Sequence, residues 1–429
     1  MASVVTTHPE HGQACGWNAL LPPRAPEPAL TGEAHADFVV IGAGYTGISA
    51  ARAWAERRRD DVVYLLDAST VGEGSPGRNS GFLLDIALAD DADPAAADRM
   101  AQMNALTRGA VARLRALVET HAIDCQFAPR GTYRAAATDR GLEAIAAYRA
   151  FLEAANLPYE ALDRDALEAR LGTGHYRGGL YSPDCHLAQP AALIRGLADA
   201  LPENVRLFER SPVQAVRREG EHWCVRTDAG VVRARHVLFA NNAWAGGLGV
   251  GADRLTPVFT FAALTAPLDA DVFGSDPEWG LLPAAKLGTT VRRTRDDRLL
   301  LRTGYSYRRE APRADVETRL RSSLARRWPG LADVPFEQFW GGSTGVTFDA
   351  TPVFDVRADG LMIAAGCNGG GVVKGTLFGE LAVQRALGED TPDVSALFGR
   401  APWVPPDPIR RIGFSLLVRH WDRQAGAEA

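Results

Sequence analysis

Three glycines that follow a short apolar run constrain this chain more than any other feature. Residues 38–41 (Phe-Val-Val-Ile) are wholly apolar, which is typical of a buried parallel strand. Gly42, Gly44 and Gly47 come next, in the spacing G-x-G-x-x-G. Such glycines allow a tight turn, a close approach of the backbone to a pyrophosphate, and close packing of a helix on a sheet. The sequence therefore predicts a strand–turn–helix unit that binds a dinucleotide.

The residues after this turn complete the unit and indicate its ligand. A helix is expected through Arg58, and residues 62–66 predict a second buried strand that ends at Asp67. A helix N-terminus carries free N–H groups and about +0.5 of a charge, which favours a phosphate. An acid at the end of the second strand accepts hydrogen bonds from a ribose hydroxyl and disfavours a 2′-phosphate.

Two further glycine-rich segments indicate a large cofactor that extends beyond the first glycine turn. Residues 68–82 are polar and rich in glycine, where a nicotinamide-dependent protein would continue into another helix. Residues 365–375 form a second glycine cluster about 300 residues later and also precede an expected helix. Two sets of backbone donors fit a cofactor held at both ends. A bare nicotinamide-binding protein is the weakest alternative, because it leaves both segments unexplained.

Composition excludes several other classes. The 429 residues carry a net charge of −5, which gives no electrostatic support for nucleic-acid binding. The longest uncharged run, residues 237–252, is too short and too polar to span a membrane. No basic segment followed by an apolar one opens the chain, so a cytoplasmic location is expected. The five cysteines are scattered and His186 has no second spaced ligand, so neither a disulfide framework nor a metal site is expected.

The pattern of the remaining chain predicts a Pro-rich extended arm, several helices and many short strands. Helices are expected over 94–120, 141–155, 187–201, 313–328 and 375–387, and strands over 127–137, 205–240, 255–310 and 361–365. A hairpin turn is expected at 295–298. In the tail, Ile409, Ile412, Leu416 and Leu417 indicate a short amphipathic helix.

Five segments together resemble the D-amino-acid-oxidase-like superfamily of FAD-dependent amine oxidoreductases, and within it the gamma-glutamylputrescine oxidase and sarcosine oxidase-like branch. They are ADFVVIGAGYTGISAA (36–51), GSPGRNSGF (74–82), VLFANNAWAGGL (237–248), GGSTGVTFDATPVF (341–354) and AAGCNGGGVVKGTLFGELA (364–382). The resemblance implies an α/β protein (α+β overall): a Rossmann-like FAD-binding domain with an inserted mixed-sheet substrate domain. We expect a Pro-rich arm over 1–36, an FAD-binding domain over 37–90, 187–250 and 345–390, a substrate domain over 91–186 and 251–344, and a C-terminal tail over 391–429.

The resemblance also implies which residues bind FAD. The AMP half would be held by Gly42, Ala43, Gly44, Tyr45, Thr46, Gly47, Asp67, Ala68 and Ser69, with backbone contacts from Val213 to the adenine. Near the pyrophosphate and the flavin we expect Arg78, Asn79, Ser80, Gly81, Ala240, Asn241, Trp244, Gly341, Gly366, Gly369, Gly370, Gly371, Val372 and Lys374. Amides aimed at the pyrimidine end would stabilise the negative charge of reduced flavin.

Departures from the family pattern carry their own predictions. Relatives that attach flavin covalently use a His where this chain has Arg78, or a Cys in the stretch that is here 340–342, so we expect non-covalent FAD. Relatives that oxidise α-amino acids carry an Arg before the T-x-D-x-x-P motif, whereas residues 342–345 hold none. Sarcosine-type relatives place a Lys where Val373 stands, one residue before Lys374. An amine is therefore favoured over an amino acid.

The expected catalytic set is Arg302, Tyr305, Trp340 and Lys374. Arg302 stands where sarcosine-type relatives carry the lysine that activates oxygen, and it keeps the positive charge. Tyr305 and Trp340 would wall an amine pocket, since aromatic faces suit alkylammonium groups. Lys286 and Lys374 are the only two lysines among 47 basic residues; Lys286 follows a turn and is expected in a solvated loop.

The expected reaction is hydride transfer from the carbon next to a neutral amine, giving an imine that hydrolyses to an aldehyde. The partners would be a polyamine-like or substituted alkylamine and either O2 or another electron acceptor. Two alternatives stay open. One is an α-amino-acid or N-methyl-amino-acid oxidase or dehydrogenase that anchors its carboxylate through Arg302 or Lys374. The other is a non-catalytic flavoprotein subunit of a larger complex.

Overall fold

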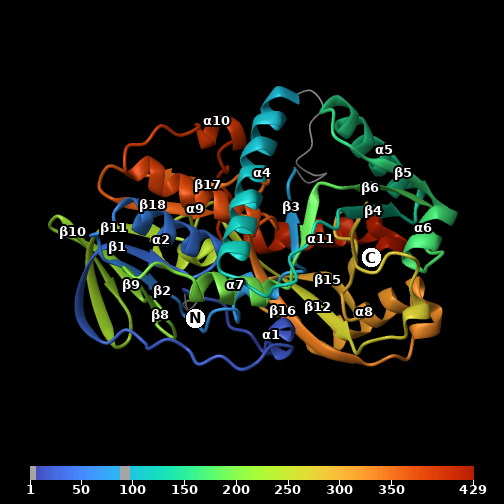
Figure 1. Ribbon diagram of the computed structural model, residues 1–429, viewed down its shortest axis with the longest axis horizontal. Coiled ribbons are helices and arrows are strands. Elements are labelled where there is room, and N and C mark those ends of the chain that lie inside the picture. Colours follow the sequence, from blue (N-terminus) through green and yellow to red (C-terminus); the bar gives the residue numbers. More distant parts are fainter. Residues whose placement is uncertain (1–5, 87–96) are drawn as a thin grey trace.

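The computed structural model describes residues 6–86 and 97–429, and Figure 1 shows two eight-stranded sheets side by side with α4 between them. The helices are α1 Gly16–Ala19, α2 Tyr45–Arg57, α3 Ser75–Arg78, α4 Ala97–Thr120, α5 Asp139–Ala154, α6 Arg164–Leu171, α7 Pro190–Asp199, α8 Arg313–Arg327, α9 Val373–Ala386, α10 Val394–Phe398 and α11 Ile409–Ala425. Short 3-10 helices are η2 Asn242–Leu248, η3 Ala270–Val272, η4 Pro329–Leu331 and η5 Gly426–Glu428.

The strands belong to three sheets. The first sheet has the order β17-β18-β11-β1-β2-β8, with the β9–β10 hairpin continuing from β11; the second has the order β16-β12-β15-β14-β13-β4-β6-β5; β3 and β7 form a small pair. Their bounds are β1 Gly32–Ile41, β2 Val63–Leu66, β3 Phe82–Leu84, β4 Thr132–Ala136, β5 Glu160–Asp163, β6 Gly178–Ser182, β7 Cys185–Leu187, β8 Val205–Phe208, β9 Ala215–Glu219, β10 His222–Arg226, β11 Gly230–Phe239, β12 Thr256–Thr265, β13 Trp279–Pro283, β14 Thr290–Arg293, β15 Leu299–Tyr307, β16 Phe336–Val346, β17 Val353–Val356 and β18 Leu361–Ala365.

The first sheet has a parallel centre that is buried on both faces. Strands β18, β11, β1, β2 and β8 run parallel, while β17 is antiparallel to β18. Phe38 and Val40 of β1 pack in one core with α2 and α9, whereas Val39 and Ile41 pack in another with β10 and β11. Burial on both faces explains why this strand reads as a continuous apolar run.

The second sheet is mixed, with one parallel pair, β13 and β4, among antiparallel neighbours. Leu299 and Leu301 face the core that includes α8, while Leu300 faces Trp340 and the N-terminal arm. Successive side chains of β15 therefore point to opposite faces of the sheet: one face is covered by α8, and the other faces the N-terminal arm. The expected fold class, an α/β domain joined to a mixed sheet, is confirmed.

Most element predictions are confirmed, with shifted ends. The predicted helix over 94–120 is α4, of which residues 97–120 are described and 94–96 lie outside the described residues. The predicted domain boundary at 90/91 also lies outside them, and the domain division stays a prediction. The expected strand over 127–137 begins only at Thr132, and Leu187, expected in a helix, ends β7. The turn at 295–298 joins β14 to β15, with Asp297 at φ 59°.

Both ends of the chain differ from expectation. The arm, expected to be extended, contains the one-turn helix α1, and Figure 1 shows the segment after it running along the lower edge to β1. In the tail, the expected short helix is the 17-residue α11. The four residues whose spacing predicted an apolar face are exposed to solvent: Ile409, Ile412, Leu416 and Leu417. The helix rests on other contacts, including Phe414 against Tyr307.

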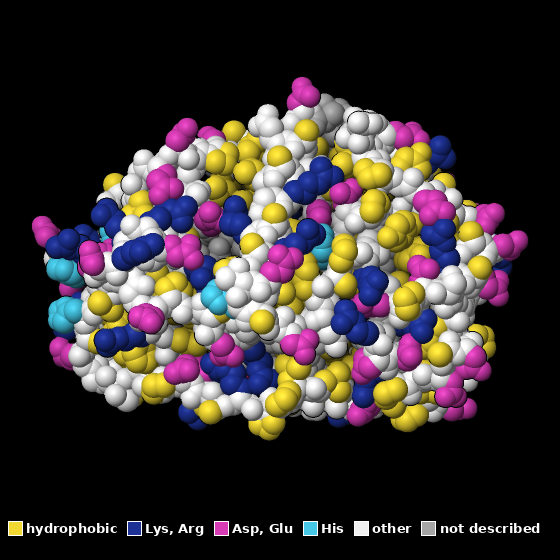
Figure 2. Space-filling view, in the orientation of Figure 1, with side chains coloured by type: hydrophobic (Ala, Val, Ile, Leu, Met, Phe, Trp, Pro, Cys, Tyr) yellow, Lys and Arg dark blue, Asp and Glu magenta, His cyan; other side chains and the backbone are white. Residues whose placement is uncertain are grey.

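Surface and helix properties bear on the excluded classes. Figure 2 shows basic and acidic side chains interspersed over one face of the molecule, in keeping with a net charge of −5. In residues 6–86 and 97–429, no helix combines the length and the apolar character that crossing a membrane requires.

Candidate active site

The glycine turn between β1 and α2 is closed by hydrogen bonds to β2 and to Asp67. The Gly42 amide donates to the Leu66 carbonyl at 2.7 Å, and the Ala43 amide donates to Asp67 Oδ2 at 2.9 Å. Gly44 is the N-cap residue of α2, so the amides of Tyr45, Thr46 and Gly47 stand in the first turn. First-turn amides have no carbonyl partner within their own helix and favour a phosphate.

None of the three glycines leaves room for a side chain. Gly42 has φ 104°, and a Cβ on it would lie 3.0 Å from the Ala240 carbonyl oxygen. A Cβ on Gly44 would lie 2.9 Å from Pro76, and one on Gly47 would collide with the Gly42 carbonyl oxygen. The glycines therefore allow the tight turn and the close packing of α2 on it that a dinucleotide-binding turn needs.

Asp67 is fixed by its neighbours at the end of β2. Its Oδ1 accepts from the Ser69 amide at 2.9 Å, and the loop after β8 lies alongside, since the Ser211 amide donates to the Asp67 carbonyl at 2.7 Å. Burial raises the pKa of the Asp67 carboxyl, and the hydrogen bonds from Ser69 and Ala43 oppose that shift. Ala68 follows Asp67 directly, and Val213, two residues past Ser211, is buried beside Tyr64 and Leu66 in one core.

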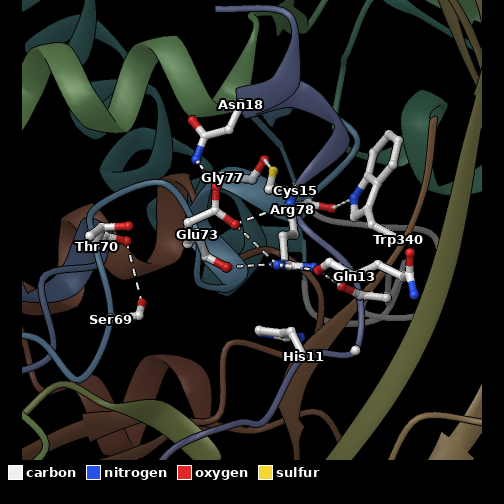
Figure 3. Close-up of polar contacts among 12 residues, drawn as sticks. His11, Gln13, Cys15, Asn18, Ser69, Thr70, Glu73, Gly77, Arg78 and Trp340 are labelled. Carbon is white, nitrogen blue, oxygen red and sulfur yellow. Dashed lines mark hydrogen bonds and ion pairs between the residues drawn. The ribbon is translucent and has the colours of Figure 1, made fainter. Parts of the chain in front are cut away.

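Arg78, at the end of α3, joins this loop to the second sheet. Its guanidinium donates to the carbonyls of Glu73 (2.5 Å), Gly341 (2.8 Å) and Gln13 (2.8 Å) and pairs with the Glu73 carboxylate at 3.2 Å (Figure 3). The Trp340 indole N–H donates to the Arg78 carbonyl at 3.0 Å. Four residues from three segments thus bond Arg78 and hold this short helix in place.

Asn79 and Gly81 continue the same loop. The Asn79 side chain donates to the Pro76 carbonyl at 2.6 Å and accepts from the Gly81 amide at 2.8 Å. Arg292, fully buried on β14, donates to the Ser80 carbonyl at 3.1 Å and the Ala188 carbonyl at 2.6 Å. Burial lowers the pKa of Arg292, and Glu278 opposes that shift.

The N-terminal arm contributes to the site, which the sequence did not predict. The Cys15 amide and the Asn18 side chain both donate to the Glu73 carboxylate, at 3.1 and 2.7 Å (Figure 3). The Trp17 indole N–H donates to the Asn79 carbonyl at 2.8 Å. The tryptophan at position 17, in a stretch without periodicity, was the one available signal in the sequence, and it did not identify the Asn79 carbonyl as its partner.

The second glycine cluster lies between β18 and α9. Gly366 and Gly369 adopt φ 74° and 88°, and the Gly366 amide donates to Asn242 Oδ1 at 2.8 Å. Gly370 follows, and α9 begins at Val373, so Gly371 and Val372 place their amides at the helix N-terminus. Lys374 is the second residue of α9.

The residues after β11 bring the two glycine segments together. Ala240 and Asn241 contact the Gly42 turn, and Trp244 of η2 donates to Ser343 Oγ at 3.3 Å. Among the described residues, Asn241 Oδ1 and Ser80 Oγ are buried without a hydrogen-bond partner. Buried polar atoms that lack a partner within the protein can bond a polar cofactor. The residues expected to bind FAD are therefore suited to that role.

The expected catalytic residues come from three elements. Arg302 and Tyr305 lie on β15 and Trp340 on β16, with β12 between these two strands. Lys374 lies on α9. Ala262 pairs with both Arg302 and Trp340, so these two lie on the same face of the second sheet. The Arg302 guanidinium lies 5.8 Å from the centroid of the Tyr305 ring. Trp340 is fully buried against Trp17, with ring centroids 6.2 Å apart.

His186 and Lys286 each contact side chains from other segments. His186 lies 3.3 Å from Asp85 Oδ1 and contacts Arg115, and residues 6–86 and 97–429 contain no group of three or more potential metal ligands. Lys286 is exposed, as expected, and its ammonium lies 5.3 Å from the centroid of the Trp421 ring.

A parallel sheet with a dinucleotide turn, joined to a mixed sheet through a second glycine cluster, defines a dinucleotide-dependent flavoprotein fold. The sequence of residues 37–385 matches the DAO family, described as FAD dependent oxidoreductase. The chain belongs to this family and is an FAD-dependent oxidoreductase, which confirms the expected enzyme class and cofactor.

Named relatives agree with this assignment. The chain is 30% identical to gamma-glutamylputrescine oxidoreductase of Escherichia coli (strain K12) over 382 residues, 85% of this chain and 87% of that protein. It is 29% identical to the probable oxidoreductase OrdL of Rhizobium meliloti (strain 1021) over 394 residues, 87% and 88% of the two chains. The fold is similar to that of glycine oxidase from Geobacillus kaustophilus, with TM-score 0.74, 20% identity, and coverage of 87% and 100%. These likenesses confirm the branch expected from the sequence.

Proposed function

We propose that this chain oxidises an amine at the carbon adjacent to nitrogen and releases an imine that hydrolyses to an aldehyde. Bound FAD supplies the two-electron acceptor for the hydride. The protein's part is to hold the substrate carbon against the cofactor, to exclude water and to keep the reacting nitrogen neutral. Arg302, on the sheet face that carries Trp340, would place a fixed positive charge there.

The observation that carries this proposal is that the buried guanidinium groups at the cofactor loop are already bonded. Arg78 donates to three carbonyls and pairs with Glu73, and Arg292 donates to two carbonyls and pairs with Glu278 at 3.4 Å. All three guanidinium nitrogens of Arg78 are bonded, and in Arg292 only the buried Nε lacks a partner. Residues 342–345 of β16 hold no cation either, so an amine without a nearby carboxylate fits better.

A second candidate function rests on Arg302. Among the described residues Arg302 forms no ion pair, and its guanidinium lies over the face of the Tyr305 ring. It could therefore anchor the carboxylate of an amino acid, as a bidentate partner. Matched substrates with and without a carboxylate, tested on the wild type and on Arg302→Ala, separate the two. A rise in KM confined to the carboxylate-bearing substrate would favour the amino acid.

The first test is the visible spectrum of the purified chain, recorded before and after acid precipitation. Flavin bands that move to the supernatant support non-covalent FAD, whereas flavin that stays in the pellet contradicts it. The same sample is then mixed anaerobically with a panel of amines. Bleaching by an amine supports the proposed function, and its rate should rise with pH as the amine becomes neutral. No bleaching by any amine or amino acid would favour a non-catalytic flavoprotein subunit.

A further inference from the structure

His11 of the N-terminal arm and Glu310, which follows β15, meet beside the cofactor loop. His11 Nδ1 lies 3.4 Å from Glu310 Oε1, and the Gly12 amide donates to Oε2 at 3.1 Å. Gly341 of β16 lies against this carboxylate, since a Cβ there would stand 2.5 Å from Oε1. The Gly341 carbonyl accepts a hydrogen bond from Arg78. Gly341 therefore lies between the His11–Glu310 pair and Arg78, which belongs to the loop that is expected to hold the flavin.

Both side chains keep hydrogen-bonding capacity in reserve. The His11 side chain is only 10% exposed, and its Nε2 is buried with no partner among the described residues. The Glu310 side chain is 20% exposed, so solvent or a ligand reaches it. The Phe259 ring lies edge-on to the imidazole, with centroids 5.9 Å apart. An acceptor nitrogen, a carboxylate and an aromatic ring converge on one small region.

The charge state of the pair suits a cation. Burial, together with the charge of Arg78, lowers the pKa of His11, so the imidazole is neutral near pH 7. Burial would raise the pKa of Glu310, but the hydrogen bonds from His11 and Gly12 and the charge of Arg78 hold it below its usual value. The facing charges are then Glu310 and Glu73, both negative, and Arg78, positive. The region carries one net negative charge.

We infer that His11 and Glu310 form a subsite for a second ammonium group of a diamine substrate, remote from the amine that is oxidised. This inference rests on the proposed function. Glu310 accepts the ammonium through its carboxylate, and the His11 Nδ1–H and the Gly12 amide hold that carboxylate in place. The N-terminal arm thereby takes part in substrate recognition, because His11 belongs to it and holds the carboxylate of Glu310, which follows β15 of the second sheet.

The experiment measures binding of two amines that differ by one charge. FAD-loaded protein, its flavin first reduced so that bound amine cannot react, is titrated anaerobically with 1,4-diaminobutane and with 1-aminobutane, and dissociation constants come from calorimetry. The variants are Glu310→Gln, which keeps the shape, and His11→Phe, which keeps a ring against Phe259. Asp315→Asn is the matched control, because Asp315 is an exposed carboxylate in the first turn of α8.

The wild type should bind the diamine more tightly than the monoamine. Glu310→Gln should weaken diamine binding by about tenfold or more, because a charge-assisted hydrogen bond is lost, and should leave monoamine binding within about twofold. His11→Phe should cause a smaller loss, again confined to the diamine. Asp315→Asn should change neither constant. Retained flavin absorbance and an unchanged Tm establish that each variant is folded.

Three results would overturn the subsite: no diamine binding by the wild type, no preference over the monoamine, or a preference that survives in Glu310→Gln. Failure of the proposed function looks different, because then no amine bleaches the wild-type flavin. If amines bleach the flavin while Glu310→Gln keeps its diamine preference, the function stands and the subsite is wrong.

Discussion

The two segments that are expected to hold the cofactor are built in opposite ways. The glycine turn at Gly42–Gly47 and its acid Asp67 come from one continuous stretch and depend on backbone geometry. The cofactor loop around Arg78 is held by the N-terminal arm, by β14 and by β16, which are far apart in the sequence. The first segment is encoded locally, whereas the second exists only once distant parts of the chain have met. Mutations in the two segments should therefore fail differently.

The largest effect should come from Arg78→Met, which tests the cofactor loop. Removing this cation leaves three carbonyls without their donor and the Glu73 carboxylate without its ion-pair partner, at a cost of about 3–5 kcal/mol in unfolding free energy. FAD affinity should fall as well, because the loop loses its ties to the arm and to β16. Chemical denaturation and flavin retention on gel filtration measure both.

Arg108→Met is the matched control for that change. The Arg108 side chain is 44% exposed and pairs with Asp184 at 2.8 Å. An exposed pair is worth about 0–1 kcal/mol. Equal losses in the two variants would show that the contacts of Arg78 carry no special weight.

Gly47→Ala, in the glycine turn, should destabilise the protein less than Arg78→Met does, but should release the cofactor. A Cβ there collides with the Gly42 carbonyl oxygen, and such overpacking costs about 1–3 kcal/mol. The turn would open and FAD would be released on dilution. Gly109→Ala in α4, where a Cβ meets nothing within 4 Å, should instead be neutral or stabilise by about 0.5–1 kcal/mol. Full FAD retention by Gly47→Ala would contradict the described turn.

Trp17→Phe probes the link between the arm and the cofactor loop. The change keeps most of the buried ring but removes the N–H that donates to the Asn79 carbonyl, so unfolding free energy should fall by about 1 kcal/mol. The rate of FAD release should rise, since Asn79 belongs to that loop. An unchanged release rate would separate the arm from cofactor binding.

The smallest effect concerns pH. Burial lowers the pKa of His11 from its ordinary value of 6.5, so the folded state takes up this proton less readily than the unfolded state. The resulting stability is fully present above pH 6.5 and is lost as pH falls below it. His11→Phe should therefore show a shallower fall in Tm between pH 7 and pH 5.5 than the wild type. Identical slopes in the two proteins would show that protonation of His11 does not contribute to the pH dependence of stability.

Sequence reasoning succeeded where structure is local. The apolar run before Gly42, the glycine spacing and Asp67 predicted strand, turn, helix and strand, because their steric needs act over a few residues. The family resemblance extended this to FAD and to the enzyme class. The roles expected for Arg302 and Trp340 stay predictions; the register with Ala262 puts both residues on one sheet face.

It failed where a residue's neighbours come from elsewhere. Glu73 and Glu310 look like ordinary surface acids in the sequence, yet each accepts hydrogen bonds from the N-terminal arm. The tail helix shows the reverse error: the spacing of Ile409, Ile412, Leu416 and Leu417 indicated one apolar face, and that face is exposed. Periodicity defines a face of a helix but not the partner against which it packs.

The sequence by itself determined the dinucleotide turn, the alternating burial of the strands and the membership of an FAD-dependent family, because backbone sterics and side-chain period act within a short stretch. Only the tertiary structure decided that the arm lies against the cofactor loop, that Arg78 and Arg292 are bonded to carbonyls, and that His11 meets Glu310. Apart from the contact of Arg78 with the Glu73 carbonyl, those pairings span from 55 to 299 residues of sequence. They form because a buried polar group needs a hydrogen-bond partner, and the fold brings that partner from a distant segment.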